Sequence, residues 1–272
     1  MKLHTLHFAT ILSVLIAACG GNDTSPPLFI SESQEIETGQ EVHRELVAEY
    51  DLLPRDGNEE VYAYVEALGQ EVVQASLRPE LTHFFYILDT ELVNAFAAPG
   101  GYIYVTTGLM QNISSKAELA SILAHEVGHI SAYHGAKAME SSLALSLFSE
   151  LLLGDSEATA EVVEFVVGTY LSTAHSQDQE LQADRLGIEF VTRAAYNPWG
   201  IVDFFTWLDA ITEDSMFSFL SSHPEPYERI LESSAEINRL GITTDDPSYI
   251  IDDPDAPYTE VLDLLFFDRD EI

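Results

Sequence analysis

The chain has 272 residues, of which 46% are apolar, enough to bury the core of one catalytic domain or of two small ones. Its 46 acidic side chains far outnumber its 11 lysines and arginines, and a formal net charge of −35 would repel nucleic-acid phosphates and anionic lipid headgroups. We therefore expect no nucleic-acid partner, and the single cysteine excludes an internal disulfide.

The N-terminus has the order of a secretory signal peptide over residues 1–18: a lysine, an apolar run too short to span a bilayer, and two small residues. The following cysteine, in the context LIAACG, resembles a bacterial lipobox, in which cleavage leaves Cys19 to carry lipid. Acyl chains would anchor the protein to a membrane, at about 0.8 kcal/mol per buried methylene. Gly20 resembles the residue found in lipoproteins sent to the outer membrane. The alternative is an ordinary signal and an incidental buried cysteine.

Three further regions follow the signal peptide. Residues 19–40 mix small, polar and proline residues without periodicity, which predicts a flexible tether behind the lipidated cysteine. Helical patterns dominate residues 41–240, with one strand-rich block at 83–106, and this predicts a mostly helical α+β domain with a small β-sheet. Residues 241–272 form a predicted acidic C-terminal tail, which we expect to dock by the apolar side chains of residues 261–267.

The chemistry is concentrated in a predicted buried helix that begins after Ser115. His125 and His129 are four residues apart, so both imidazoles project from one face and can bind a single divalent metal ion. Glu126 is rotated by about 100° from His125, near enough to reach a water molecule that attacks a substrate. This is the H-E-x-x-H arrangement, although two histidines on a helix can also be ordinary core or surface groups.

The apolar stretches within residues 142–171 are each too short to cross a bilayer. They predict a pair of helices packed on the catalytic domain. The alternative is a hairpin that covers the active-site cleft or touches the membrane near Cys19.

A catalytic zinc ion usually has three protein ligands and one open position, so a third ligand is needed. A third histidine of the H-E-x-x-H-x-x-G-x-x-H pattern is absent, because residues 132 and 135 are alanine and glycine. Glu150 has no acidic partner four residues later, whereas Glu180 stacks with Asp184 on one face of a predicted helix. Glu180 is therefore the better third ligand, and Asp184 would accept the outer N–H of a ligating histidine. The alternative is a solvated acidic helix face.

These motifs together resemble the M48 family of metallopeptidases, whose short secreted and lipoprotein members are the nearest in organisation. The resemblance covers about residues 41–240 and rests on segments in the family's order: 93–109, 125–129, 175–187, 196–198, 222–224 and 229–230. It implies a gluzincin-like zincin fold. One departure is Gln177, where the family often has arginine, so a charge contact there would be missing.

The resemblance also implies how a substrate is held. The block at residues 93–106 would place a sheet edge beside the zinc ion, and an extended peptide would bind that edge through main-chain hydrogen bonds. The residues assigned to substrate binding are Asn94, Tyr102, Ile103 and Tyr104. Asn94 could instead only cap a turn. His223 resembles the family histidine that lies next to the metal and either stabilises the oxyanion or occupies the water site in a resting form.

The expected function is hydrolysis of a peptide bond on one zinc ion held by His125, His129 and Glu180, with Glu126 as the base and His223 as a further catalytic residue. By resemblance, the substrates would be misfolded or misassembled envelope proteins at the periplasmic face of the outer membrane. One alternative is a zinc-bound assembly factor or chaperone that rarely cuts. A purely structural zinc site is disfavoured, because such sites usually have four protein ligands and often cysteines.

The acidity of the chain has two interpretations. Apart from Lys2, its lysines are Lys116 and Lys137, and the carboxylates are spread along the chain. This favours adaptation of the whole surface to salty surroundings, where screening weakens self-repulsion, over one particular cationic partner.

Overall fold

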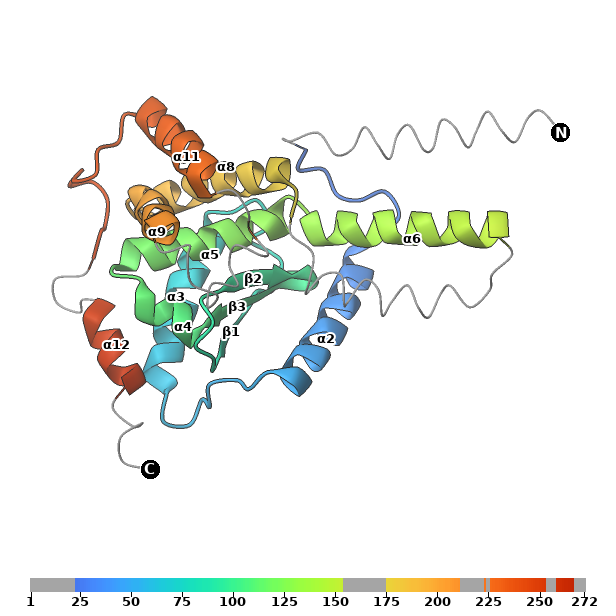
Figure 1. Cartoon of the computed structure of the whole chain (residues 1–272), viewed down its shortest axis with the longest axis horizontal. Coiled ribbons are helices and arrows are strands. Elements are labelled where there is room, and N and C mark those ends of the chain that lie inside the picture. The colour runs from blue at the N-terminus through green and yellow to red at the C-terminus, as the bar shows by residue number, and fades with distance from the viewer. Residues whose placement is uncertain (1–22, 154–174, 211–222, 224–225, 253–257, 267–272) are drawn as a thin grey trace.

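The computed structural model describes residues 23–153, 175–210, 223, 226–252 and 258–266 (Figure 1). Its helices and strands, in chain order, are α2 (Glu32–Glu49), α3 (Glu59–Gln74), β1 (Phe84–Leu88), β2 (Ala95–Ala98), the 3₁₀ turn η1 (Pro99–Gly101), β3 (Tyr102–Thr106), α4 (Thr107–Asn112), α5 (Lys116–Ser131), α6 (His134–Leu153), α8 (Gln177–Arg193), α9 (Trp199–Ala210), α11 (Pro226–Leu240) and α12 (Tyr258–Phe266). The prediction of a mostly helical α+β domain with a small sheet is confirmed.

The sheet has three strands in the order β1-β3-β2. β1 runs parallel to β3, and β2 runs antiparallel to it. The turn η1 between β2 and β3 requires glycine, because Gly101 has a φ of 91° and a Cβ atom there would lie 2.2 Å from the carbonyl oxygen of Thr82. The tight turn pairs β2 with one side of β3, and β1 pairs with the other side, so β2 lies at an edge of the sheet.

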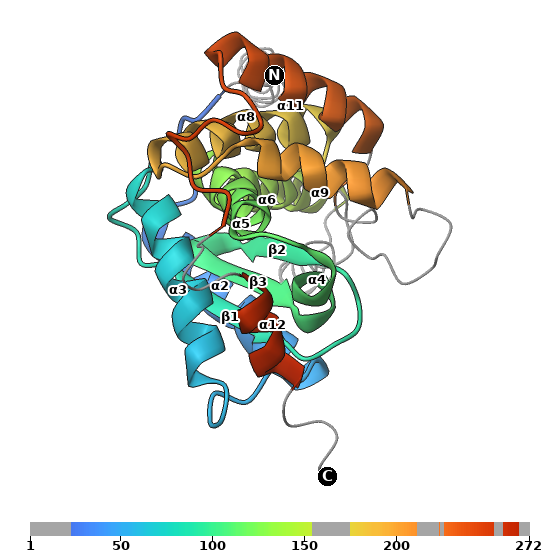
Figure 2. The ribbon, with the colours of Figure 1, turned by 90° about the vertical axis from the view of Figure 1, so that its left-hand side faces the viewer.

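The molecule is built in layers, which Figure 2 shows from the side: α11, then α8 and α9, then α5, then the sheet, then α2. One face of the sheet, with Ile103 and Val105, packs on α3 and α5 in the main core. The other face, with Tyr102 and Tyr104, packs on α2 in a second core. The central helix α5 is therefore covered on both sides, and all its residues from Ala117 to Ser131 are buried.

Two glycines bring α5 and α8 unusually close together. A Cβ atom on Gly128 would lie 2.8 Å from the carbonyl oxygen of Ala183, and one on Gly187 would lie 3.1 Å from the backbone nitrogen of His125. The two helices thus touch backbone to backbone at the level of the H-E-x-x-H motif. This contact determines the spacing between side chains that the two helices carry.

The predicted flexible tether is wrong over residues 32–40. Those residues form the first half of α2, which begins with a capping box between Ser31 and Gln34. Glu35 is buried and accepts hydrogen bonds from Arg78 at 3.0 and 2.9 Å, and Arg78 also donates to the carbonyl oxygen of Ile130 at the end of α5. The sequence pattern did not predict this helix, because burial of Glu35 on its inner face depends on Arg78, which lies 43 residues later in the chain.

The C-terminal region packs on the domain. Helix α12 lies against α3 and α4, with Tyr258, Val261 and Leu265 buried. The hydroxyl of Tyr258 donates to the carbonyl oxygen of Met110 at 2.8 Å. An apolar docking contact was expected here, and Tyr258 is a part of it that the sequence analysis did not name.

The first half of the predicted 142–171 hairpin belongs to α6, which projects from the body of the domain (Figure 1). Its second half, the signal peptide and Cys19 all lie outside the described residues. Within the part of the chain that the structure describes, none of the helices combines the length and the apolar character needed to cross a bilayer.

Candidate metal centre

The two histidines of the H-E-x-x-H motif face the same point in space. Helix α5 follows the N-cap Ser115, whose hydroxyl accepts from the backbone N–H of Glu118, and it contains no proline. One turn of this helix brings the Nε2 atoms of His125 and His129 to 3.0 Å from each other. Both side chains are buried, so these nitrogens need a partner that is not bulk water.

Glu180 reaches the same point from α8. A capping box between Ser176 and Gln179 starts this helix just before the glutamate. The Glu180 carboxylate oxygens lie 3.5 Å from Nε2 of His125 and 3.4 Å from Nε2 of His129. Sequence reasoning selected Glu180 over Glu150, and the structure brings Glu180 to the two histidines.

His223 completes the cluster. Its Nδ1 lies 3.0 Å from both oxygens of Glu180 and 3.3 Å from Nε2 of His125. One nitrogen or oxygen from each of His125, His129, Glu180 and His223 lies within 4.8 Å of the others, and all four residues are buried. Three imidazoles and a carboxylate converging in this way form a donor set that suits zinc.

Glu126 supports a reactive metal centre. Both of its carboxylate oxygens are buried, and neither has a hydrogen-bond partner among the described residues. Its nearest ion-pair contact is His223 Nε2 at 3.6 Å. Burial raises the pKa of Glu126, as expected for a carboxylate that takes up and releases a proton near neutral pH. A carboxylate buried without partners is costly unless water or substrate contacts it in the working state.

Asp184 lies one helical turn after Glu180, with Oδ1 at 2.8 Å from Nδ1 of His125. The outer nitrogen of one candidate ligand thus faces a carboxylate, which is the arrangement that sequence analysis expected. Arg229 of α11 binds the same carboxylate at 2.6 and 2.8 Å, and also binds Glu180 at 2.8 Å.

The sequence analysis assigned no role to Arg229. It is fully buried and stacks over the ring of Phe205 at 4.0 Å. A signal was available, because Arg229, Ser233 and Ile237 share the buried face of α11 at helical spacing. An arginine on the buried face of a helix needs buried carboxylates, and this chain offers Glu180 and Asp184.

The charges of the cluster set its protonation state. For Glu180 and Asp184, burial disfavours ionisation, but nearby positive charge outweighs it and holds the pKa of both below the ordinary range; His223 and Arg229 act on Glu180, and Arg229 acts on Asp184. Burial lowers the pKa of His129 well below its ordinary value. For His125, burial and Arg229 disfavour protonation, but Asp184 and Glu180 outweigh them and raise the pKa to about 9. A metal ion would therefore displace a proton from His125.

Two further histidines, His134 and His175, lie beside His129, and the sequence analysis assigned neither of them a function. The ring of His175 lies over that of His129 with 4.0 Å between centroids. The Nδ1 atom of His134 lies 2.8 Å from Nδ1 of His129. Burial lowers the pKa of His134 to about 4 and that of His175 to about 3, so both are neutral at pH 7.

The assignment of Tyr102, Ile103 and Tyr104 to a substrate-binding sheet edge is wrong in its geometry. They belong to β3, the central strand, whose main chain is paired with β1 on one side and β2 on the other. The side chains of Tyr102 and Tyr104 pack on the α2 side, away from α5. The edge strand next to the cluster is β2, where the carbonyl oxygen of Ala95 lies 3.3 Å from Nε2 of His223.

Asn94 lies immediately before β2, and its main-chain N–H donates to the hydroxyl of Thr106 at 3.1 Å. It is therefore next to the edge strand, whereas its part in binding a substrate stays a prediction. Gln177, at the position where a charge contact was expected to be missing, donates a hydrogen bond to Glu228 and so still links α8 to α11.

Comparison with known proteins agrees with this geometry. Residues 59–237 match the profile of Peptidase family M48. The chain is 24% identical over 253 residues to the beta-barrel assembly-enhancing protease of Escherichia coli (strain K12), covering 85% of this chain and 50% of that protein. It is 29% identical over 143 residues to the mitochondrial metalloendopeptidase OMA1 of Arabidopsis thaliana, covering 53% of this chain and 29% of that protein. It is 26% identical over 144 residues to metalloprotease YcaL of Escherichia coli, covering 52% of this chain and 56% of that protein. The chain spans about half the length of the bacterial relatives it matches.

Proposed function

Because the chain belongs to peptidase family M48, a family of metallopeptidases, we propose that it is a zinc-dependent endopeptidase. The observation that carries the proposal is the buried cluster of His125, His129, Glu180 and His223 with the unpartnered carboxylate of Glu126 beside it. In this proposal His125, His129 and Glu180 hold one zinc ion. When bound, the zinc ion supplies a Lewis acid that polarises the scissile carbonyl group and makes water a better nucleophile.

The protein residues then handle protons and position the substrate. Glu126 takes a proton from the attacking water and later delivers it to the leaving amine. His223 donates a hydrogen bond to the oxygen on which negative charge develops. Asp184, held by Arg229, keeps the proton of His125 on Nδ1, so that Nε2 faces the ligand cluster. An extended peptide binds along the edge of β2 that faces away from β3.

The substrates proposed are misfolded or misassembled proteins of the bacterial cell envelope. Support comes from the similarity to the beta-barrel assembly-enhancing protease of Escherichia coli. The N-terminal signal and Cys19 support lipid anchoring in that compartment, at the periplasmic face of the outer membrane.

The second candidate is a zinc-bound assembly factor or chaperone with little proteolytic turnover. It is favoured by the contacts of His223, which lies among the ligand atoms and also against Ala95 of the edge strand. A side chain in that place competes with both water and peptide. A purely structural zinc site is disfavoured, because a buried base such as Glu126 has no purpose there.

The test is digestion of an unfolded protein, casein, by the chain that starts after Cys19. Wild type is compared with Glu126→Gln, with a chelator-treated sample to which zinc is added back, and with the control Glu118→Gln, which alters another buried glutamate of α5. Loss of cleavage in Glu126→Gln but not in Glu118→Gln, with one zinc ion per chain in both variants, supports the endopeptidase. If zinc binds and neither wild type nor His223→Ala cuts, the assembly factor is the better candidate. If no zinc binds, both proposals fail.

A further inference from the structure

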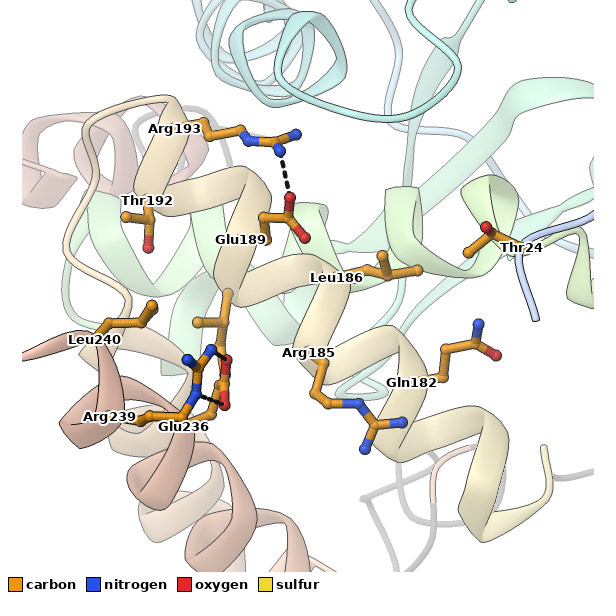
Figure 3. A pocket seen from close by; sticks show the side chains of 11 residues that line it. Thr24, Gln182, Arg185, Leu186, Glu189, Thr192, Arg193, Glu236, Arg239 and Leu240 are labelled. Atoms are coloured by element: carbon orange, nitrogen blue, oxygen red, sulfur yellow. Dashed lines mark hydrogen bonds and ion pairs between the residues drawn. The ribbon is translucent and has the colours of Figure 1, made fainter. Parts of the chain in front are cut away.

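Three buried side chains form a hydrogen-bonded row that leads away from the metal cluster. The Nδ1 atoms of His129 and His134 are 2.8 Å apart, and Nε2 of His134 lies 3.1 Å from Oε1 of Gln182. The three side chains are 1%, 2% and 5% exposed, so water does not compete for these contacts. Gln182 lies two residues after Glu180 on α8 and is one of the residues that line a surface cavity of about 480 Å³ (Figure 3).

When His129 binds a metal ion, the hydrogen bonds of the row can be donated in only one direction, from His129 to His134 and from His134 to Gln182. A neutral imidazole has one N–H donor and one acceptor nitrogen. If Nε2 of His129 binds the metal, its proton is on Nδ1 and is donated to Nδ1 of His134. The proton of His134 is then on Nε2 and is donated to the amide oxygen of Gln182. The reverse direction would place a proton on Nε2 of His129, where it would block the metal.

We propose that His134, held by Gln182, is a positioning residue that fixes the tautomer and ring orientation of His129 as a metal ligand. This rests on the proposed zinc site. In this proposal helix α8 contributes to the metal site in two ways. Glu180 is itself a ligand, and Gln182 orients His134, which in turn orients the ligand His129 of α5. The two histidine ligands are held differently, since His125 faces the carboxylate of Asp184 and His129 faces a neutral ring.

The competing interpretation is a second metal ion bound by His129, His134 and His175, which can bring three nitrogens within 4.8 Å of one another. This second site is disfavoured because His129 would have to bind the zinc ion through Nε2 and the second metal ion through Nδ1. Binding through both would require removal of the last ring proton, whereas the hydrogen-bonded row requires no ionisation.

The test measures zinc affinity and stoichiometry of the full chain by competition with a chromophoric chelator, without any peptide substrate. His134→Phe removes the acceptor, His134→Asn restores an acceptor oxygen near the place of Nδ1, and Gln182→Leu removes the far end of the row. His43→Phe is the matched control, because His43 also makes one Nδ1 contact, 2.9 Å from the Tyr104 hydroxyl, among aromatic rings remote from the metal.

We expect zinc affinity to fall about 10- to 100-fold in His134→Phe, to recover most of that loss in His134→Asn, and to fall several-fold in Gln182→Leu. The control should bind zinc like wild type. If His134→Phe does not fold, the comparison of Gln182→Leu with wild type decides. Unchanged affinity in the folded variants, or a second zinc ion in wild type that both His134→Phe and His175→Phe lose, overturns the inference. Absence of zinc from wild type would instead overturn the proposed function.

Discussion

The guanidinium of Arg229 and the carboxylate of Asp184 face each other across the contact between α11 and α8, with nitrogen–oxygen distances of 2.6 and 2.8 Å. The same guanidinium binds Glu180, so two buried carboxylates share one cation. These contacts join α8 to α11, and the His125 side chain of α5 faces the same Asp184 carboxylate.

Replacing Arg229 with methionine should therefore destabilise the metal-free protein by about 3–5 kcal/mol, because two buried carboxylates lose their cation. Denaturant unfolding of the metal-free protein measures this loss. Arg239→Met is the control, since Arg239 pairs with Glu236 on the exposed side of the same helix and its removal should leave stability unchanged. Equal stability of the two variants would contradict the role of the buried pair.

Zinc binding should strengthen as the pH rises. The pKa of His125 is raised to about 9, so at neutral pH the ion must displace a proton, and this competition weakens as the proton is lost. Affinity should rise about tenfold per pH unit between about pH 7 and pH 9 and then level off. Chelator competition over this range tests the slope. In Asp184→Asn the curve should level off at a lower pH, because a contact that raises the pKa of His125 is lost; a flat wild-type curve would refute the explanation.

The close contact of α5 with α8 should not tolerate a side chain at residue 128. In Gly128→Ala the new methyl group would meet the backbone of Ala183, and the strain should cost about 1–3 kcal/mol and weaken zinc binding. Gly187→Ala should have a smaller effect, because its nearest contact is 3.1 Å rather than 2.8 Å. Thermal unfolding with and without zinc separates the two effects. If Gly128→Ala changes neither the stability nor the zinc binding of the protein, α5 and α8 can move apart without cost.

The edge of β2 that faces away from β3 should be needed for peptide cleavage. The carbonyl oxygen of Ala95 points away from β3, and because main-chain groups alternate along a strand, those of Ala97 do so as well. Ala97→Pro removes the outward N–H and should lower kcat/KM by about fivefold, the equivalent of one hydrogen bond of about 1 kcal/mol. Zinc affinity should not change. Cleavage kinetics with unaltered kcat/KM would place the peptide elsewhere.

The acidic surface should make stability depend on salt. With a formal charge of −35, screening reduces self-repulsion, so the melting temperature should rise as KCl is raised. An uncharged osmolyte at the same osmolality is the control. A melting temperature that responds equally to both would argue against adaptation of the surface to salt.

Much of the metal centre could be predicted from the sequence because its parts are local. The spacing of His125 and His129, and of Glu180 and Asp184, fixes which side chains share a helix face, and the structure brings both faces together. The helix predicted to carry Glu180 and Asp184 is α8, which runs from Gln177 to Arg193.

The parts that were missed depend on contacts between distant segments. Helical spacing places Arg229 on the buried face of α11, but its carboxylate partners lie on α8. The roles of His134 and Gln182 likewise depend on the side chains that they contact on other elements. The error over β3 has a similar cause. Alternation identified two strands around a turn, but the identity of the edge strand depends on β1, which enters from the other side and pairs with β3.

The backbone contact between α5 and α8 has a consequence for the choice of metal. Donors carried by two helices that touch without intervening side chains cannot spread apart to receive a larger ion unless the core is repacked. Helix packing therefore sets the separation between the donors carried by α5 and those carried by α8. We therefore expect the proposed site to bind small ions such as zinc more tightly than large ions such as calcium.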